Sequence, residues 1–110
     1  MPSGGVRVEA WSLPKMASEN VNERYHEFLR AGSMSAGLYR LSAGSPDLQK
    51  PHEQDELYYV VTGQARFESE AESVAVGPGS LLFVEKRRPH RFVDIVEDLL
   101  VLVMFAPEES

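Results

Sequence analysis

Two histidines and one glutamate are the residues of this sequence whose types and spacing could do chemistry. His52 and Glu56 lie at the entrance of the apolar run ELYYVV, and His90 opens a second run, HRFVDI. If these runs are neighbouring strands with the three side chains facing inward, two imidazoles and a carboxylate converge at one place. Divalent first-row metals accept these ligands, and three protein ligands leave coordination positions open for a substrate.

Strand alternation predicts an apolar and aromatic floor beneath this site. Side chains two residues apart on a strand share a face, so Tyr58 shares the face of Glu56. By the same rule Phe92 and Asp94 share the face of His90. Apolar walls with a few polar groups are typical of small-molecule pockets.

Each of these residues also has a simpler explanation. A lone histidine in a small β-domain is more often structural or exposed than a metal ligand, and His26 has no carboxylate pattern beyond Glu27. The runs EQDE and EKRR each fit a solvated turn, although the basic run could line a pocket mouth and favour an acidic ligand. The residues alone therefore predict a β-domain with a candidate site.

Composition excludes several classes of protein. A length of 110 residues fits one domain, which we expect over residues 1–110. A formal net charge of −6 argues against a nucleic-acid partner, and the absence of cysteine excludes disulfides and thiolate metal sites. The chain shows no signal-peptide pattern, and its longest apolar run, DLLVLVMFAP, is far shorter than a membrane span. We therefore expect a cytoplasmic protein without membrane contact.

The chain as a whole reads as short strands separated by turns. We predict about eight to ten strands at roughly 8–12-residue spacing, without a long amphipathic helix between them, which favours an antiparallel sandwich or barrel. Residues 1–23 are predicted to hold a strand at 6–11, followed by a loop or one helical turn. Residues 21–30 fit a strand or a helix, with a hairpin to residues 33–44 favoured. Residues 107–110 are predicted to be loose.

Residues 44–63 match the spacing of a known motif. Gly44 is followed after five residues by Lys50, with His52 two positions later, Glu56 after three more residues and Gly63 after a further six. The chain here resembles the cupins, small β-barrels whose first motif reads glycine, His-x-His, glutamate and glycine at these intervals.

The second cupin motif matches residues 79–94. Gly79 is followed after five residues by Glu85 and Arg87, which stand where the family has the proline and glycine of Pro-x-Gly. His90 follows after two residues, and Asp94 replaces the usual asparagine after three more. Only fifteen residues separate the two motifs, a short insert like that of the smallest cupins.

The resemblance implies an all-β, antiparallel fold of the double-stranded β-helix or jelly-roll barrel type. Cupins usually bind metal through two histidines and a glutamate of motif one and a histidine of motif two. His52, Glu56 and His90 occupy three of these positions, so they are the expected ligands of a divalent ion such as Fe, Mn, Ni or Zn.

Lys50 occupies the position of the fourth ligand, and a protonated ammonium has no lone pair for a metal. Three arrangements are open. Lys50 turns away from a three-ligand site, with Gln49 or Asp55 as substitute ligands; or it points inward and holds an anionic substrate group beside the metal; or it pairs with Glu56 in a barrel without metal.

The resemblance implies an enzyme of dioxygenase, isomerase or lyase type acting on a small, potentially anionic, organic substrate. Tyr58 is the candidate proton donor, and Lys50 or Arg91 is the candidate to hold a substrate carboxylate. The alternative is a non-catalytic ligand-binding or sensor cupin with a weakened or empty metal site, or a structural relic of one. The consecutive apolar positions of LLFV and LLVLVMF predict strands covered on both faces, which favours a homodimer that pairs two sheets.

Overall fold

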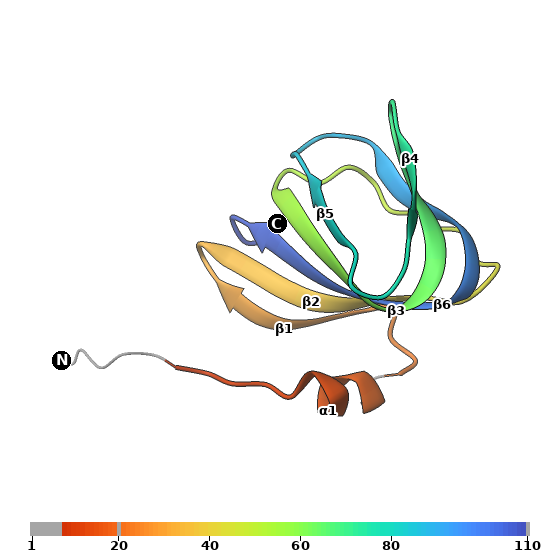
Figure 1. Cartoon of the computed structure of the whole chain (residues 1–110). Helices are drawn as coiled ribbons and strands as arrows, with labels where there is room; N and C mark the ends of the chain where they lie inside the picture. The colour runs from red at the N-terminus through yellow and green to blue at the C-terminus, as the bar shows by residue number, and fades with distance from the viewer. Residues whose placement is uncertain (1–7, 20, 110) are drawn as a thin grey trace.

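The computed structural model describes residues 8–19 and 21–109, which fold into a mostly antiparallel β-structure, as predicted (Figure 1). The elements are α1 (Leu13–Ser18), β1 (Tyr25–Ala31), β2 (Met34–Leu41), β3 (Asp55–Ser69), β4 (Ser73–Val76), β5 (Leu81–Val84) and β6 (His90–Ala106). The sheet order is β1-β2-β6-β3-β4, and β5 pairs with β3 on the same edge as β4. The long strands β3 and β6 bend strongly, so the sheet curls round and encloses the core.

The described residues form six strands rather than the predicted eight to ten. The reason is that β3 joins the runs ELYYVV and ARFE, and β6 joins the runs HRFVDI and LLVLVMFA, which the sequence predicts as separate strands. Register shifts between Val60 and Arg66 absorb the change of direction, as β-bulges do in a bent strand. Gly63 therefore lies at a bend within β3 and not between two separate strands.

Gly63 permits this bend. Its φ is +101°, and a Cβ at this position would collide with the backbone of Asp98 and Leu99 in β6. The motif glycines Gly44 and Gly79 also have positive φ, +78° and +92°, but open space surrounds their Cβ positions. Only glycine adopts this left-handed region without strain. The glycines of the two motifs therefore mark the positions where the backbone bends.

The prediction that Asp94 shares the inner face of His90 is wrong. His90 and Phe92 are buried as expected, but Asp94 is exposed with φ +49°, and Ile95 takes the next inward position. A left-handed residue resets the alternation of a strand, and aspartate tolerates that conformation better than most residues do.

The N-terminal strand predicted at 6–11 is absent from its described part, residues 8–11. The predicted helical turn is present as α1, with the side chain of Ser12 as its N-cap. Trp11 packs edge-on against Phe28 at a ring-centroid distance of 5.0 Å, so a side-chain contact takes the place of sheet pairing. None of the helices in the described part of the chain is long and apolar enough to cross a membrane.

The segment after β6, residues 107–109, is held in place rather than loose. The predicted hairpin of β1 and β2 receives it: the Glu108 N–H donates to a carbonyl of the hairpin turn at 3.2 Å, and the Glu109 N–H donates to Oγ of buried Ser35 at 2.8 Å. The side chains of Arg30 and Glu108 also form an ion pair.

We expect Gly63→Ala to lower the free energy of unfolding by about 3 kcal/mol and Gly79→Ala by about 1–2 kcal/mol. Both changes force a Cβ into left-handed backbone, but only at Gly63 does the Cβ meet the backbone of β6. Urea unfolding followed by circular dichroism measures both losses. Equal losses would mean that left-handed strain alone, without the collision with β6, explains the need for glycine at position 63.

Candidate metal centre

Glu56 and His90 form a buried pair at the heart of the site. Both side chains are 1% exposed, and Nε2 of His90 lies 3.0 Å from Oε1 of Glu56. Nδ1 of His90 lies 2.7 Å from the carbonyl oxygen of Arg88, so it donates its proton there. A nitrogen lone pair and a carboxylate oxygen repel each other at this distance unless a positive charge lies between them. That charge is a proton or a metal ion.

The surroundings of His90 act on its proton affinity in both directions. Burial lowers the pKa of His90, but the hydrogen bonds to Glu56 and to the Arg88 carbonyl and the charge of Glu56 outweigh burial, so the pKa is raised. The same negative surroundings attract a metal cation, which competes with the proton for the ring nitrogen.

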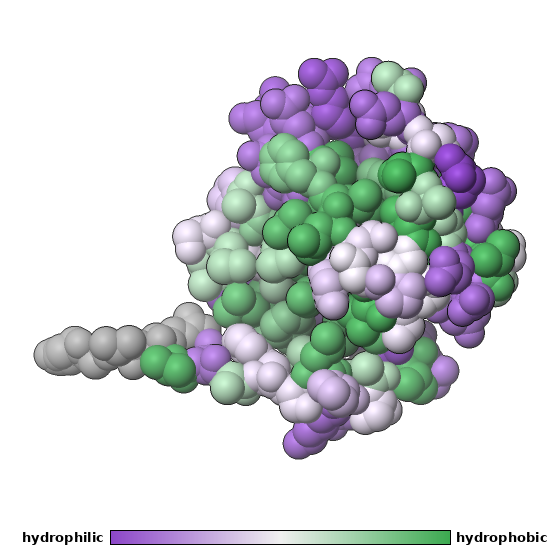
Figure 2. All heavy atoms as spheres, viewed as in Figure 1, coloured by the Kyte–Doolittle hydropathy of each residue, from purple (hydrophilic) through white to green (hydrophobic). Residues whose placement is uncertain are grey.

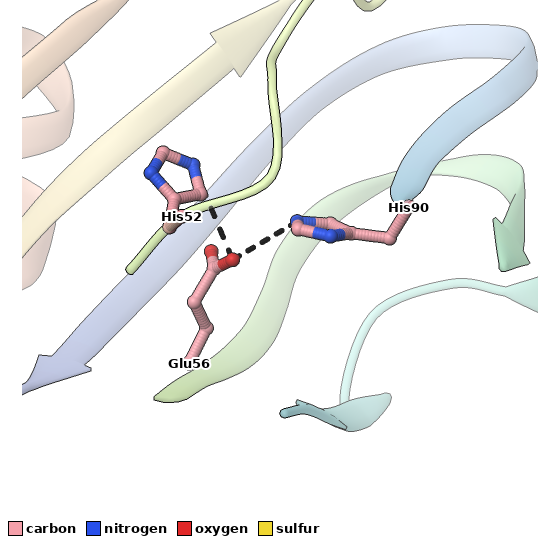
Figure 3. A group of neighbouring side chains, drawn as sticks. All are labelled: His52, Glu56 and His90. Atoms are coloured by element: carbon pink, nitrogen blue, oxygen red, sulfur yellow. Dashed lines mark ion pairs between the residues drawn. The ribbon is translucent and has the colours of Figure 1, made fainter. Parts of the chain in front are cut away.

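His52 lies across the Glu56 carboxylate from His90 (Figure 3). Its Nε2 is 4.0 Å from Oε1 of Glu56, and one ligand atom from each of the three residues lies within 4.8 Å of the others. Ligands held about 2.1 Å from a metal at right angles lie about 3.0 Å apart. The Glu56–His90 pair has this separation, and a small movement of the His52 ring would reach it.

The second carboxylate oxygen of Glu56 tests whether these residues fit a metal. Oε2 is buried and has no hydrogen-bond partner within the described residues. An unpaired buried acceptor costs about 1–3 kcal/mol, or more when it is charged, and native proteins keep few of them. Two imidazoles and a carboxylate are a donor set that divalent first-row metals accept. The residues therefore fit a divalent ion.

Three elements bring the expected ligands together. Glu56 and Tyr58 alternate inward on β3 and are 2% and 1% exposed, as predicted. His90 is the first residue of β6, and His52 precedes β3 in a loop. The Arg87 N–H donates to the carbonyl of His52 at 2.7 Å, which ties that loop to the turn before His90. Arg87 has φ +64° at the position where the family has glycine.

Tyr58 contributes a hydroxyl to the site. Its oxygen lies 3.0 Å from Nε2 of His90 and 3.0 Å from Oε1 of Gln49. Burial and the charge of Glu56 raise the pKa of Tyr58 well above its ordinary value, so the phenol stays protonated. Tyr58 is therefore placed as a hydrogen-bond donor beside the candidate ligands.

Gln49, and not Lys50, brings a further oxygen to the site. Nε2 of Gln49 donates to the buried carboxylate of Asp47 at 2.7 Å. This bond turns Oε1 of Gln49 toward Tyr58 and to 3.4 Å from Nε2 of His52. Amide oxygen is an accepted ligand for harder divalent ions, so Gln49 is the candidate for the fourth position.

Three residues considered from the sequence do not reach the site. Lys50 is exposed, and no hydrogen bond or ion pair joins it to another described residue. Asp55 accepts the backbone N–H of Lys86 at 2.9 Å, and Arg91 pairs with Glu68 at 3.1 Å on the surface. Among the described residues there is therefore neither the inward-pointing ammonium nor the lysine–glutamate pair.

A cavity of about 190 Å³ opens beside His52. Its walls are Tyr25, Tyr39, Tyr58, Val103 and Phe105, with the polar groups of Gln49, His52 and Glu109. The floor is aromatic, as predicted, and no lysine or arginine is among these residues. Sites for drug-sized ligands occupy about 300–1,000 Å³, so this cavity suits a smaller molecule.

Glu109 is a site residue that the sequence did not reveal. Its Oε2 lies 3.1 Å from Nδ1 of His52. Burial raises the pKa of Glu109, and the nearby His52 acts in the opposite direction. No local pattern marks this glutamate, because its position depends on the docking of residues 107–109 on the β1–β2 hairpin.

The sequence matches known proteins over most of its length. The family model described as the cupin domain matches residues 37–105. An uncharacterised protein of Streptomyces coelicolor is 44% identical over 105 residues, which cover 94% of this chain and 100% of that protein.

Solved structures share the fold. A protein from Thermus thermophilus has a TM-score of 0.72 at 25% identity, over 92% of this chain and 99% of that one. The DMSP lyase DddQ from Ruegeria pomeroyi has a TM-score of 0.68 at 21% identity, over 80% of this chain and 49% of the lyase. This chain spans about half the length of that lyase, and the likeness is one of fold.

We expect Tyr58→Phe to lower the free energy of unfolding by about 1–2 kcal/mol, because it removes the hydroxyl that contacts half-buried Gln49 and buried His90. Tyr25→Phe is the matched control. The Tyr25 hydroxyl is buried and has no partner within the described residues, so its removal should be neutral or stabilising. Denaturant titration of the metal-free protein measures both changes, and equal losses would contradict the distinction.

Proposed function

The chain belongs to the cupin domain family, and from this membership and the geometry of the site we propose that it is a metal-dependent enzyme whose divalent ion is held by His52, Glu56 and His90. The observation that carries the proposal is the buried Glu56–His90 pair, in which the second oxygen of Glu56 has no hydrogen-bond partner in the described part of the chain. Iron, manganese, nickel and zinc all accept this donor set.

A bound ion would supply Lewis acidity to an oxygen atom of a small organic substrate. The cavity beside His52 would hold that substrate, and its aromatic walls would exclude water. The protonated hydroxyl of Tyr58 would donate a hydrogen bond or a proton at the reacting end. Gln49, oriented by Asp47, would supply the oxygen in place of the missing histidine.

We propose a dioxygenase, isomerase or lyase reaction on a small organic substrate, for which the metal ion and not a lysine or arginine would be the positive partner. The expected cationic groups, Lys50 and Arg91, are exposed and are not among the walls of this cavity. Arg91 lines a separate hollow beside Gln49 and His90. Among the described residues that line this cavity, the carboxylate of Glu109 is the one charged side chain besides the histidine. Apart from the metal ion, these walls would therefore offer no lysine or arginine to a substrate carboxylate.

The proposal predicts that the protein takes up about one divalent ion per chain. Elemental analysis of the purified protein and titration calorimetry with Fe²⁺, Mn²⁺, Ni²⁺ and Zn²⁺ measure this uptake. Gln49→Ala should weaken binding about tenfold or more, because it removes an oxygen from the site. Lys50→Ala should leave binding equal or slightly tighter, because it removes only an exposed cation.

The controls separate ligand loss from unfolding. His90→Ala should abolish uptake, whereas His26→Ala should not, because His26 lies on β1 and pairs with Glu23 at 3.2 Å. A wild-type protein that contains no metal and takes up none of the four ions would refute the proposal. Stabilisation by a small molecule without product on long incubation would indicate a ligand-binding cupin instead.

We also propose that two copies pair through an apolar patch of Leu57, Leu81 and Phe83. These side chains are 37%, 65% and 68% exposed, and Leu57 and Phe83 are directly opposite in the β3–β5 register. Hydrophobic residues gather on this face of the molecule (Figure 2). A two-fold axis would bring the same patch of both copies together. A second copy would then cover the outer face of these strands, as their consecutive apolar positions predict.

We expect light scattering to find a dimer for the wild type and a monomer for Phe83→Glu, because a charge at the centre of an apolar contact is costly to bury. Val96→Glu is the matched control, since Val96 is 70% exposed on β6 outside the patch. A monomeric wild type at working concentration would contradict this pairing.

A further inference from the structure

The imidazole of His52 has a carboxylate at each of its ring nitrogens. Nε2 faces Oε1 of Glu56 at 4.0 Å, and Nδ1 lies 3.1 Å from Oε2 of Glu109. The second distance is that of a hydrogen bond, and an ionised carboxylate can only accept. In the neutral ring Nδ1 therefore carries the proton and donates it to Glu109. The lone pair is then on Nε2, on the side of Glu56 and of Oε1 of Gln49, which lies 3.4 Å from Nε2. Acceptor oxygens around a lone pair favour a cation between them.

This arrangement is the one that a metal-binding histidine needs. Such histidines nearly always donate their other ring N–H to a carboxylate or carbonyl, which fixes the tautomer and the orientation of the ring. In His90 the carbonyl of Arg88 has this role, at 2.7 Å. In His52 the carboxylate of Glu109 has it.

Glu109 is itself held by the fold. Its N–H donates at 2.8 Å to Oγ of Ser35, which is 0% exposed. The preceding residue, Glu108, is anchored through its N–H to the hairpin turn. The carboxylate of Glu109 is therefore brought to His52 by backbone anchors on both residues, and its side chain is only 24% exposed.

We propose that Glu109 is a positioning residue that holds His52 as the Nδ1–H tautomer, with Nε2 directed to the metal, so that residues 107–109 complete the metal centre. This inference rests on the proposed metal-dependent function. The matched cupin domain ends at residue 105, so Glu109 lies outside the matched residues.

Zn²⁺ affinity tests the proposal in the full-length protein. Titration calorimetry should show Zn²⁺ binding about 10–100-fold weaker in Glu109→Ala than in the wild type. Glu109→Gln should lie between the two, because the amide oxygen still accepts a hydrogen bond but carries no charge. Glu108→Gln is the matched control: it removes the same charge from the same segment, and its exposed ion pair contributes little. Its affinity should stay within about twofold of the wild type.

The tautomer of His52 gives a second readout that needs no metal. Long-range ¹H–¹⁵N spectra of the metal-free protein, recorded at about pH 8 where free imidazole is neutral, distinguish the two ring nitrogens. We expect the Nδ1–H form for His52 in the wild type and in Glu108→Gln. Glu109→Ala should shift His52 toward the Nε2–H form, an effect that a merely structural glutamate would not produce.

Two outcomes would overturn the proposal: a Zn²⁺ affinity of Glu109→Ala equal to that of Glu108→Gln, or an unchanged tautomer. A wild-type protein that binds no Zn²⁺ or other divalent ion would instead refute the proposed function, and the spectra would still decide the role of Glu109. If Glu109→Ala fails to fold, Glu109→Gln decides, because it keeps the length of the side chain and the backbone bond to Ser35.

Discussion

The close approach of Glu56 to His90 is the contact on which the site depends. Two polar side chains, each 1% exposed, meet at 3.0 Å inside an apolar barrel, and such a pair is stable only when a cation lies between them or a proton joins them. The Arg88 carbonyl holds the far side of the His90 ring, so the near nitrogen must face the carboxylate. The unpartnered oxygen of Glu56 and the His52 ring beyond it then define a place for a divalent ion.

The candidate site departs from the usual cupin motif at one ligand position, and a neighbouring residue takes its place. Lys50 stands where a histidine is usual and lies exposed. The neighbouring residue, Gln49, reaches the site because buried Asp47 orients its amide. On the other side Glu109 meets His52 from a separate segment. A buried cation site needs enough oxygen and nitrogen atoms around it, and different backbone positions can supply them.

The backbone around the site is shaped by positions that share left-handed dihedral angles. Three motif glycines adopt positive φ, and so do Arg87 and Asp94. Each marks a place where a strand bends or a turn closes, so that β3 and β6 can curl while they stay paired. Arg87 adopts this conformation without being glycine, and its N–H bond to the His52 carbonyl offsets part of the strain.

The sequence by itself determined the all-β fold class and the trio of His52, Glu56 and His90, because strand alternation and motif spacing are properties of neighbouring residues. It could not place Asp94, since a bulge in β6 reverses the alternation only once the strand is paired and bent. Nor could it choose Gln49 over Lys50, because the amide of Gln49 is oriented by Asp47, and bonds from Tyr39 and Phe92 hold Asp47 in place. Glu109 is the clearest case: the tertiary structure alone decided its contact with His52, because the docking of one segment on a distant hairpin leaves no periodic signal in the sequence.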